Sequence, residues 1–149
     1  MKNISRRLAI VGCAALLAAC ASGPKHAEVQ SSIPALKASE GRLYVYRSGS
    51  MMGAAIQPNV VINGKVAGES KPGGFFFVDL APGTVEVLTS TEVEKKLTLT
   101  LDAGQTRYVR TTVGFGVLVY RVYPELVDNN AGAKEIAETS YIGKPLAKP

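Results

Sequence analysis

Residues 60–87 read VVINGKVAGESKPGGFFFVDLAPGTVEV, a series of short β-forming runs separated by turn signals. Asn63-Gly64 suits a two-residue type I′ turn because both residues tolerate a positive φ, so it predicts a β-hairpin. Ala81-Pro82-Gly83 marks a second turn, and Ala103-Gly104 marks a third turn further along the chain. This spacing of runs and turns is typical of a sandwich or a barrel.

The same pattern continues on both sides of this stretch. Leu97, Leu99 and Leu101 alternate with polar residues, as expected for a sheet with one wet face. The apolar run 75–78 indicates a central strand buried on both faces; alternatively, Phe75 and Phe77 lie in the core and Phe76 at an edge. The predicted strands span residues 42–47, 59–63, 65–68, 74–79, 84–91, 95–101, 106–113 and 117–122.

After Pro124 the pattern changes, and residues 128–130 are suited to cap a short helix over about 131–138. The sequence therefore predicts an all-β domain over residues 41–142. We expect a small antiparallel β-sandwich of about seven to eight strands with one short C-terminal helix. Residues 143–149 are expected to form an extended, mobile tail.

Three stretches carry a family resemblance: VVINGKVAGES, GGFFFVDLAPGTVEV and LTLTLDAGQTRYVR. They resemble an uncharacterised family of bacterial lipoproteins, domain of unknown function 2846, over residues 41–138. They are more distantly similar to the PEGA-type sandwich domains of cell-surface proteins. The resemblance implies a β-sandwich in the cell envelope without established chemistry.

The amino-terminal segment has the layout of a bacterial export signal. Residues 1–7 carry three positive charges, and residues 8–19 (LAIVGCAALLAA) form an apolar run. This run is too short for a spanning helix, which needs roughly 20 apolar residues. Residues 17–20 (LAAC) resemble a lipobox, which implies cleavage between Ala19 and Cys20 and a diacylglyceryl group on the Cys20 thiol. The alternatives are an ordinary secretory signal and an uncleaved anchor.

Acylation of Cys20 implies attachment to a membrane. Burial contributes roughly 0.8 kcal/mol for each methylene, so two or three long chains hold a protein on a bilayer almost permanently. An Asp after the acylated cysteine tends to retain lipoproteins at an inner membrane, and Ala21 stands there, so we expect the outer membrane, facing the periplasm. The polar, proline-containing segment 20–40 is expected to be a flexible tether.

Removal of residues 1–19 also changes the charge and the cysteine content. The full chain has a formal charge of +5, but loss of three basic residues leaves 14 basic against 12 acidic side chains, or +2. That charge gives no basic stripe for a phosphate backbone, so we expect no nucleic-acid partner. Cys13 is discarded and the Cys20 thiol is acylated, which leaves no disulfide.

The mature sequence predicts no enzyme, metal site or cofactor. Its single histidine, His26, falls in the expected tether, and zinc sites need three or four Cys, His or carboxylate ligands. The acidic residues are scattered along the chain, as is usual for turns and wet strand faces. Gly114-Phe115-Gly116 is interpreted as a bulge or a tight bend between strands.

Two groups of residues are candidate binding surfaces. Met51 and Met52 lie in an apparent loop over residues 48–58, where flexible methionines suit contact with a partner or with lipid. The interpretation that we favour is that this loop folds over the open end of the sandwich and buries them. The second group is an aromatic and cationic set suited to sugars, peptides or acidic polymers, although the interpretation that we favour is amphipathic packing at the sheet rim. Its main members are Tyr46, Arg47, Tyr108 and Arg110.

The sequence as a whole predicts a lipid-anchored envelope lipoprotein with a non-catalytic β-sandwich. Its expected partners are the membrane, through Cys20, and an envelope protein or polymer. The alternatives are an enzyme or enzyme subunit that acts on envelope polymers, and a domain that contacts the membrane surface.

Overall fold

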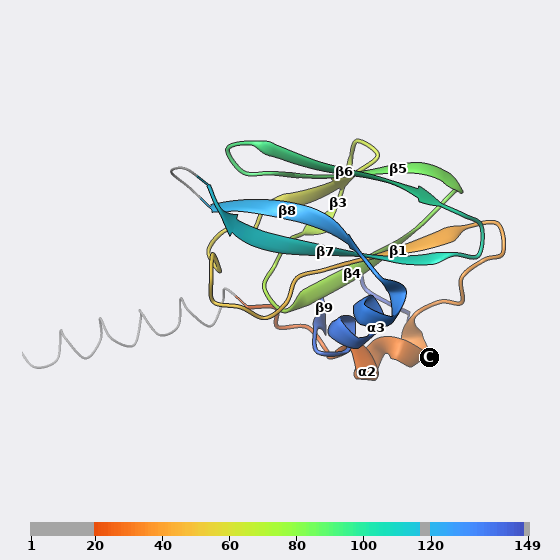
Figure 1. Cartoon of the computed structure of the whole chain (residues 1–149). Coiled ribbons are helices and arrows are strands. Elements are labelled where there is room, and N and C mark those ends of the chain that lie inside the picture. The colour runs from red at the N-terminus through yellow and green to blue at the C-terminus, as the bar shows by residue number, and fades with distance from the viewer. Residues whose placement is uncertain (1–19, 117–119, 148–149) are drawn as a thin grey trace, which may run out of the picture.

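The structure is a computed structural model that describes residues 20–116 and 120–147. The expected signal segment, which includes Ala19, lies outside the described residues, and so do residues 117–119 and 148–149. Figure 1 shows three layers: a four-stranded sheet, a five-stranded sheet, and short helices on the outer face of the five-stranded sheet. The predicted β-sandwich is confirmed, and the helical layer makes one of its sheets buried on both faces.

The four-stranded sheet contains the hairpin that the sequence signals most clearly. Asn63 and Gly64 have φ values of 48° and 77°, as a type I′ turn requires, and they join the first two strands of this sheet. All its neighbouring strands are antiparallel. In spatial order the strands are β3 (Lys65–Glu69), β2 (Asn59–Ile62), β5 (Gly83–Ser90) and β6 (Glu94–Leu101).

The five-stranded sheet is mixed, which corrects the expectation of a purely antiparallel sandwich. The first strand pairs in parallel with the seventh, and the fourth pairs in parallel with the ninth. The first of these parallel pairs arises because the turns 81–83 and 102–105 carry the chain from one sheet to the other and back. In spatial order the strands are β8 (Tyr120–Val127), β7 (Thr106–Phe115), β1 (Gly41–Tyr46), β4 (Gly74–Leu80) and β9 (Ser140–Tyr141).

The last long strand differs from its expected range. β8 runs through Pro124 to Val127, and the expected residues 117–119 lie outside the described part of the chain. Proline is tolerated there because β8 is the edge strand of its sheet and needs no ladder hydrogen bond on its outer side.

A main core fills the space between the two sheets. Leu43 and Val45 of β1 point into it, and so does Phe76 of β4. Leu99 and Leu101 of β6 also face this core, which confirms the predicted alternation of that strand. The remaining buried members are Val60, Ile62, Val85, Val87 and Val109.

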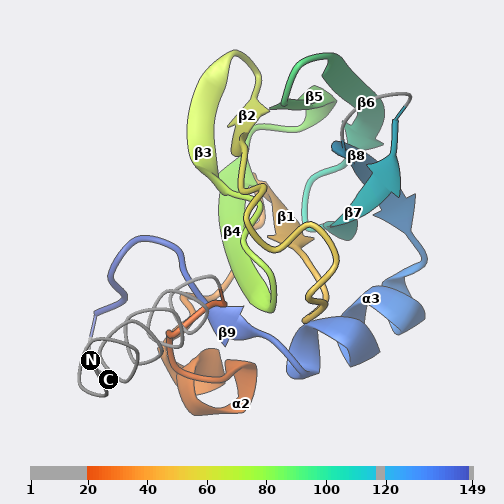
Figure 2. The same cartoon turned by 90° about the vertical axis from the view of Figure 1, so that its left-hand side faces the viewer.

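A second core lies between the five-stranded sheet and the helices. Tyr44 and Tyr46 point into it from β1, and Phe75 from β4, so both strands are buried on both faces. The helical layer consists of α2 (His26–Val29), the 3₁₀ turn η1 (Gln30–Ser32) and α3 (Asn129–Ala137), seen at the bottom of Figure 2. Asp128 caps α3 as predicted, by accepting hydrogen bonds from the amides of residues 130 and 131. In the described residues, no helix is long and apolar enough to cross a membrane.

The segment 20–40 is not the flexible tether that its composition predicts. Its first residues run along the edge of the five-stranded sheet, where Pro24 O accepts a 2.7 Å hydrogen bond from the amide of Tyr141. The amide of His26 donates to Thr139 O at 3.1 Å. Val29 is buried and Ile33 packs against the second core. Tertiary contacts therefore order a segment whose local sequence favours a linker.

The tail also differs from the expectation in its described part. Leu146 packs against the second core, and the Tyr141 hydroxyl donates a 2.7 Å hydrogen bond to Lys144 O. Residues 143–147 are therefore held on the domain rather than extended away from it.

Candidate functional site

Cys20, the predicted point of lipid attachment, lies at one end of the sandwich and is exposed. The amide of the next residue, Ala21, donates a 2.9 Å hydrogen bond to Pro72 O. Pro72 belongs to the turn that precedes β4. Cys20 is thus separated from the folded domain by a single peptide unit.

The loop that follows β1 lies at the same end. It runs from Ser48 to Pro58 and reaches the turn before β4, because a Cβ added to Gly49 would lie 3.9 Å from the Cα of Gly73. On its other side it reaches β7, because a Cβ added to Gly53 would lie 2.7 Å from Val113 Cγ1. The loop therefore connects the turn beside Cys20 with the end of β7.

Arg47 organises this loop from the inside. Its side chain is buried, with only 3% of the residue exposed. The guanidinium donates to four backbone carbonyl oxygens, those of Ile56 (2.7 Å), Ser70 (3.1 Å), Met52 (3.2 Å) and Gly53 (2.9 Å). Burial lowers the pKa of Arg47 by disfavouring its charged form. The prediction of Arg47 as part of an exposed binding surface is therefore wrong, because Nη1 and Nη2 are engaged by carbonyl oxygens of the loop and of Ser70.

Met51 and Met52 are exposed, which corrects the interpretation that the loop buries them. Their exposed fractions are 62% and 61%. The space beneath the loop is occupied by the Arg47 guanidinium and its carbonyl partners, so the methionine side chains are displaced outward. A shallow cleft of about 200 Å³ lies between the loop and β7, lined on the loop side by Arg47, Ser48, Ser50 and Met52.

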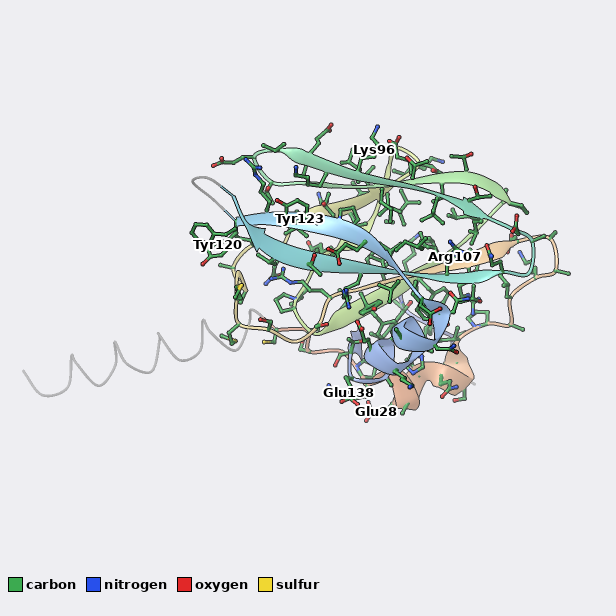
Figure 3. All side chains as sticks on the ribbon, viewed as in Figure 1. Glu28, Lys96, Arg107, Tyr120, Tyr123 and Glu138 are labelled. Atoms are coloured by element: carbon green, nitrogen blue, oxygen red, sulfur yellow. The ribbon has the colours of Figure 1, made fainter. Side chains whose placement is uncertain are left out.

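Phe115 is a further exposed apolar residue at this end, where its sequence context predicts only a bulge or a tight bend. It is the last residue of β7 and is 76% exposed. Its ring contacts Tyr120 edge to face, with centroids 4.9 Å apart. Figure 3 shows Tyr120 at the end of the sandwich from which β8 starts. The sequence feature that could have indicated an exposed Phe115 is its position between two glycines at the end of a strand.

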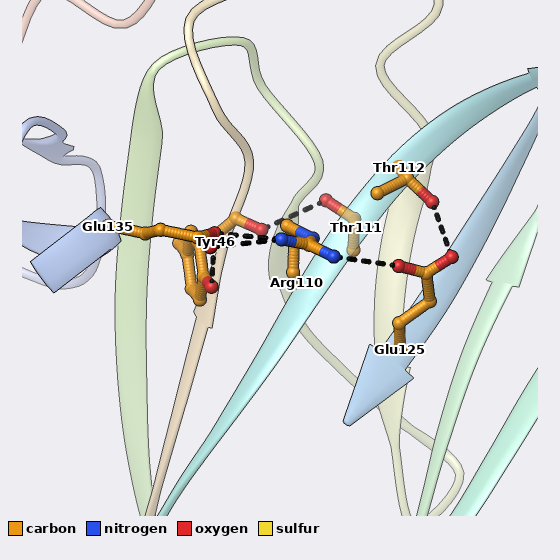
Figure 4. Close-up of polar contacts among 6 residues, drawn as sticks. All are labelled: Tyr46, Arg110, Thr111, Thr112, Glu125 and Glu135. Carbon is orange, nitrogen blue, oxygen red and sulfur yellow. Dashed lines mark hydrogen bonds and ion pairs between the residues drawn. The ribbon is translucent and has the colours of Figure 1, made fainter. Parts of the chain in front are cut away.

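Tyr46 and Arg110 belong to a polar cluster on the outer face of the five-stranded sheet (Figure 4). The Tyr46 hydroxyl donates a 2.8 Å hydrogen bond to Glu135 of α3. Arg110 Nη1 donates to both carboxylate oxygens of Glu135 at 3.0 Å, and Nη2 donates to Glu125 at 3.3 Å. Glu125 also accepts a 3.0 Å hydrogen bond from Thr112. This cluster joins α3 to β1, β7 and β8.

Neither Tyr46 nor Arg110 presents a free functional group to a ligand. Tyr46 is 2% exposed, so the expectation that it lies on a binding surface is wrong. Burial and the hydrogen bond to Glu135 raise the pKa of its hydroxyl well above the usual range. Arg110 is half-exposed, but two carboxylates already neutralise it, and the hydrogen bond to Glu135 raises its pKa.

Tyr108 packs against α3 and also lines an open cleft. Its ring stacks on Tyr44, with centroids 5.3 Å apart and planes 10° apart. Gly132 of α3 sits against the Tyr108 side chain. An open cleft of about 470 Å³ lies beside this stack, between η1 and α3, and Ile33, Arg42 and Ile136 are among the residues that line it.

The six candidate residues are therefore not brought together. Met51 and Met52 are exposed on the loop after β1, and Phe115 is exposed at the end of β7. Tyr46, Tyr108 and Arg110 belong to the contact with α3, and Arg47 supports a loop. In residues 20–116 and 120–147, no group of three or more His, Cys, Asp or Glu side chains has the arrangement of a metal site.

Comparisons with known proteins agree with the family resemblance. A family model described as a protein of unknown function (DUF2846) matches residues 37–123. An uncharacterised protein of Haemophilus influenzae is 32% identical over 145 residues, which cover 93% of this chain and 84% of that protein. No solved structure matches. The more distant similarity to PEGA-type domains stays a prediction. On the family match and this relative, the chain belongs to the DUF2846 family of proteins of unknown function.

Proposed function

We propose that this protein is a bacterial envelope lipoprotein that is anchored through acyl chains on Cys20. In this proposal residues 1–19 are removed, and the β-sandwich is a non-catalytic binding or structural module at the periplasmic face of the outer membrane. Its partners are the bilayer and an envelope protein or polymer.

The observation that carries the proposal is a lipobox-like sequence directly before a residue that contacts the domain. Residues 17–20 read LAAC after a charged and then an apolar segment. Cys20 is exposed, and the next residue, Ala21, contacts the domain through its hydrogen bond to Pro72. An acylated residue must be accessible to the enzymes that modify it, and a residue directly before the domain satisfies that requirement.

The role as a module without catalysis is supported by how the polar side chains are used. Arg47 supports a loop, and Arg110 is paired with Glu135 and Glu125. Arg42 of β1 donates two hydrogen bonds of 2.7 Å to Asp79 of β4. These groups stabilise contacts between elements, which is the role expected in a scaffold domain.

Attachment is tested with cysteine variants of the full chain in a bacterial host. Cys20→Ala should abolish incorporation of labelled palmitate and leave the protein as an uncleaved precursor. Cys13→Ala is the matched control, because it changes a cysteine of the discarded segment, and it should be labelled and cleaved normally. Globomycin should accumulate the precursor of the wild-type protein. Normal cleavage in its presence, or palmitate on Cys20→Ala, would overturn the proposal.

The membrane of residence is tested by changing Ala21. Wild-type protein should sediment with outer membranes in a density gradient, and Ala21→Asp should shift it to inner membranes. Ala21→Ser is the control, because it also introduces a polar side chain at this position but no carboxylate. Both variants keep the backbone amide that donates to Pro72. Wild-type protein in the inner membrane would contradict the outer-membrane assignment.

A further inference from the structure

We infer that the end of the sandwich at which Cys20 lies rests on the lipid bilayer. The contact is made by Met51, Met52 and Phe115, and we call these three residues the apolar end. This inference rests on the proposed acylation of Cys20. It adds a defined orientation: the domain is seated on the membrane by one end rather than held away from it on a tether.

The first argument is the shortness of the connection. Successive Cα atoms are 3.8 Å apart across a trans peptide, and Ala21 is already bonded to Pro72. The following residues stay on the domain, through hydrogen bonds between Pro24 and Tyr141 and between His26 and Thr139. With acyl chains inserted from Cys20, the turn that contains Pro72 must lie at the membrane surface. The loop 48–58, which touches this turn, is then held there as well.

The second argument is that the strand register places the other apolar residues at the same end. β1 ends at Tyr46, which pairs with Phe75 near the start of β4 and with Arg110 in the parallel strand β7. β7 then continues from there to Phe115. Figure 1 shows the loop after β1, the end of β7 and the start of β8 on the same side of the molecule.

The third argument is the chemistry of this end. Residues 48–57 read SGSMMGAAIQ and contain no charged side chain. Met51, Met52 and Phe115 are three of the six large hydrophobic residues that are exposed among those described. Methionine and phenylalanine are side chains that bury their apolar surface favourably at a lipid interface. Tyr120 beside Phe115 adds an amphipathic ring of the kind found at membrane surfaces.

Acidic side chains at this end limit the proposed contact with the bilayer to the side of the five-stranded sheet. The turn between β5 and β6 lies at the same end, but it carries the exposed residues Glu92 and Glu94. Carboxylates are costly to bury and are repelled by anionic lipids. The four-stranded sheet is therefore expected to tilt away from the bilayer.

A lipid surface fits this end better than a protein partner does. Acyl chains on Cys20 hold this end of the sandwich at the membrane, because Ala21 is already bonded to the domain, so a protein partner would have to displace lipid to reach it. Arg47 also bonds carbonyl oxygens of the loop, and both methionines on that loop are exposed.

The test uses the full chain, acylated in cells and reconstituted in vesicles of phosphatidylethanolamine and phosphatidylglycerol. The Cys13→Ala background is used, and single cysteines are introduced as Met52→Cys, Phe115→Cys and, as the control on the four-stranded sheet, Lys96→Cys. Each is labelled with an environment-sensitive fluorophore. Mass spectrometry of the same preparation confirms the acyl chains on Cys20.

We expect fluorophores at positions 52 and 115 to shift to the blue and to lose at least half of their intensity with brominated lipids, with no such change at position 96. Equal behaviour at the three positions, in protein that is acylated, would overturn the inference and leave the proposed function intact. A blue shift without lipid quenching would also overturn it, because it would indicate a protein contact. Absence of acyl chains would instead overturn the proposed function.

Discussion

The hydroxyl of Tyr46 in β1 donates a hydrogen bond of 2.8 Å to Oε2 of Glu135 in α3, across 89 residues of sequence. The same carboxylate accepts two hydrogen bonds from Arg110 of β7. One glutamate thus connects the helix to two neighbouring strands of the five-stranded sheet. Because the cluster is partly buried, its hydrogen bonds compete less with water than exposed ion pairs do.

Tyr46→Phe removes the hydroxyl and keeps the ring in the second core. Glu135 loses one partner but keeps Arg110, so we expect a loss of about 1–2 kcal/mol in the free energy of unfolding. Urea denaturation followed by circular dichroism measures it. Tyr120→Phe is the matched control, because no hydrogen bond to its hydroxyl is found within the described residues, and it should change stability by less than about 0.5 kcal/mol. Equal effects of the two variants would contradict the role of the cluster.

Arg47→Met should destabilise the protein by about 3 kcal/mol, because it leaves four carbonyl oxygens without their shared donor. Arg47→Lys should recover only part of the loss, since one ammonium does not span the same four acceptors. Limited proteolysis should show new cleavage within residues 48–57 in both variants. Arg107→Met is the control with a half-exposed arginine, and it should leave the cleavage pattern unchanged. Resistance of Arg47→Met to cleavage in the loop would contradict this account.

Stability should fall as the pH is lowered below 6.5, because of His26. Burial lowers the pKa of His26 below its usual 6.5, so in this range the unfolded chain binds more protons than the folded chain. The contribution of neutral His26 to the free energy of unfolding is complete above pH 6.5. It is lost as the pH falls toward the pKa of His26 in the folded chain. His26 is the only histidine, so His26→Gln should flatten the pH dependence of stability just below pH 6.5. An unchanged slope in His26→Gln would assign the effect to carboxylates.

The sequence predicts the sandwich because its signals are local. The Asn63-Gly64 turn has the required positive φ values, the alternation around Leu99 places that strand, and Asp128 caps α3. Each depends on residues within a few positions of one another. Parallel pairing of β1 with β7 is not local, because it depends on where the turns 81–83 and 102–105 carry the chain.

The candidate surface is only partly predictable, for a related reason. The sequence shows that Tyr46 and Arg47 lie just before an apolar loop. It does not show that the Arg47 guanidinium donates to the distant carbonyl of Ser70, or that the Tyr46 hydroxyl donates to Glu135. Burial of the arginine is what leaves Met51 and Met52 outside. Likewise, residues 20–40 have the composition of a linker, and only contacts with Tyr141 and Thr139 hold them on the domain.

Gly132 is a position at which helix propensity and packing predict opposite effects. Alanine is favoured over glycine within a helix by roughly 1 kcal/mol, so propensity alone predicts that Gly132→Ala stabilises the protein. In the structure a Cβ on Gly132 would lie 2.5 Å from the Tyr108 Cβ and still closer to its ring, so α3 or the Tyr44–Tyr108 stack must move. We expect a net loss of about 1–3 kcal/mol.

Asn130→Ala provides the control for this position, because Asn130 is exposed on the same helix and gains the propensity of alanine without a clash. It should stabilise the protein by a few tenths of a kcal/mol. Thermal and urea unfolding of the two variants therefore give shifts of opposite sign if α3 is seated against Tyr108. A stabilising Gly132→Ala would show that the helix is free to withdraw from the sheet, and the cluster around Glu135 would then contribute little to holding it there.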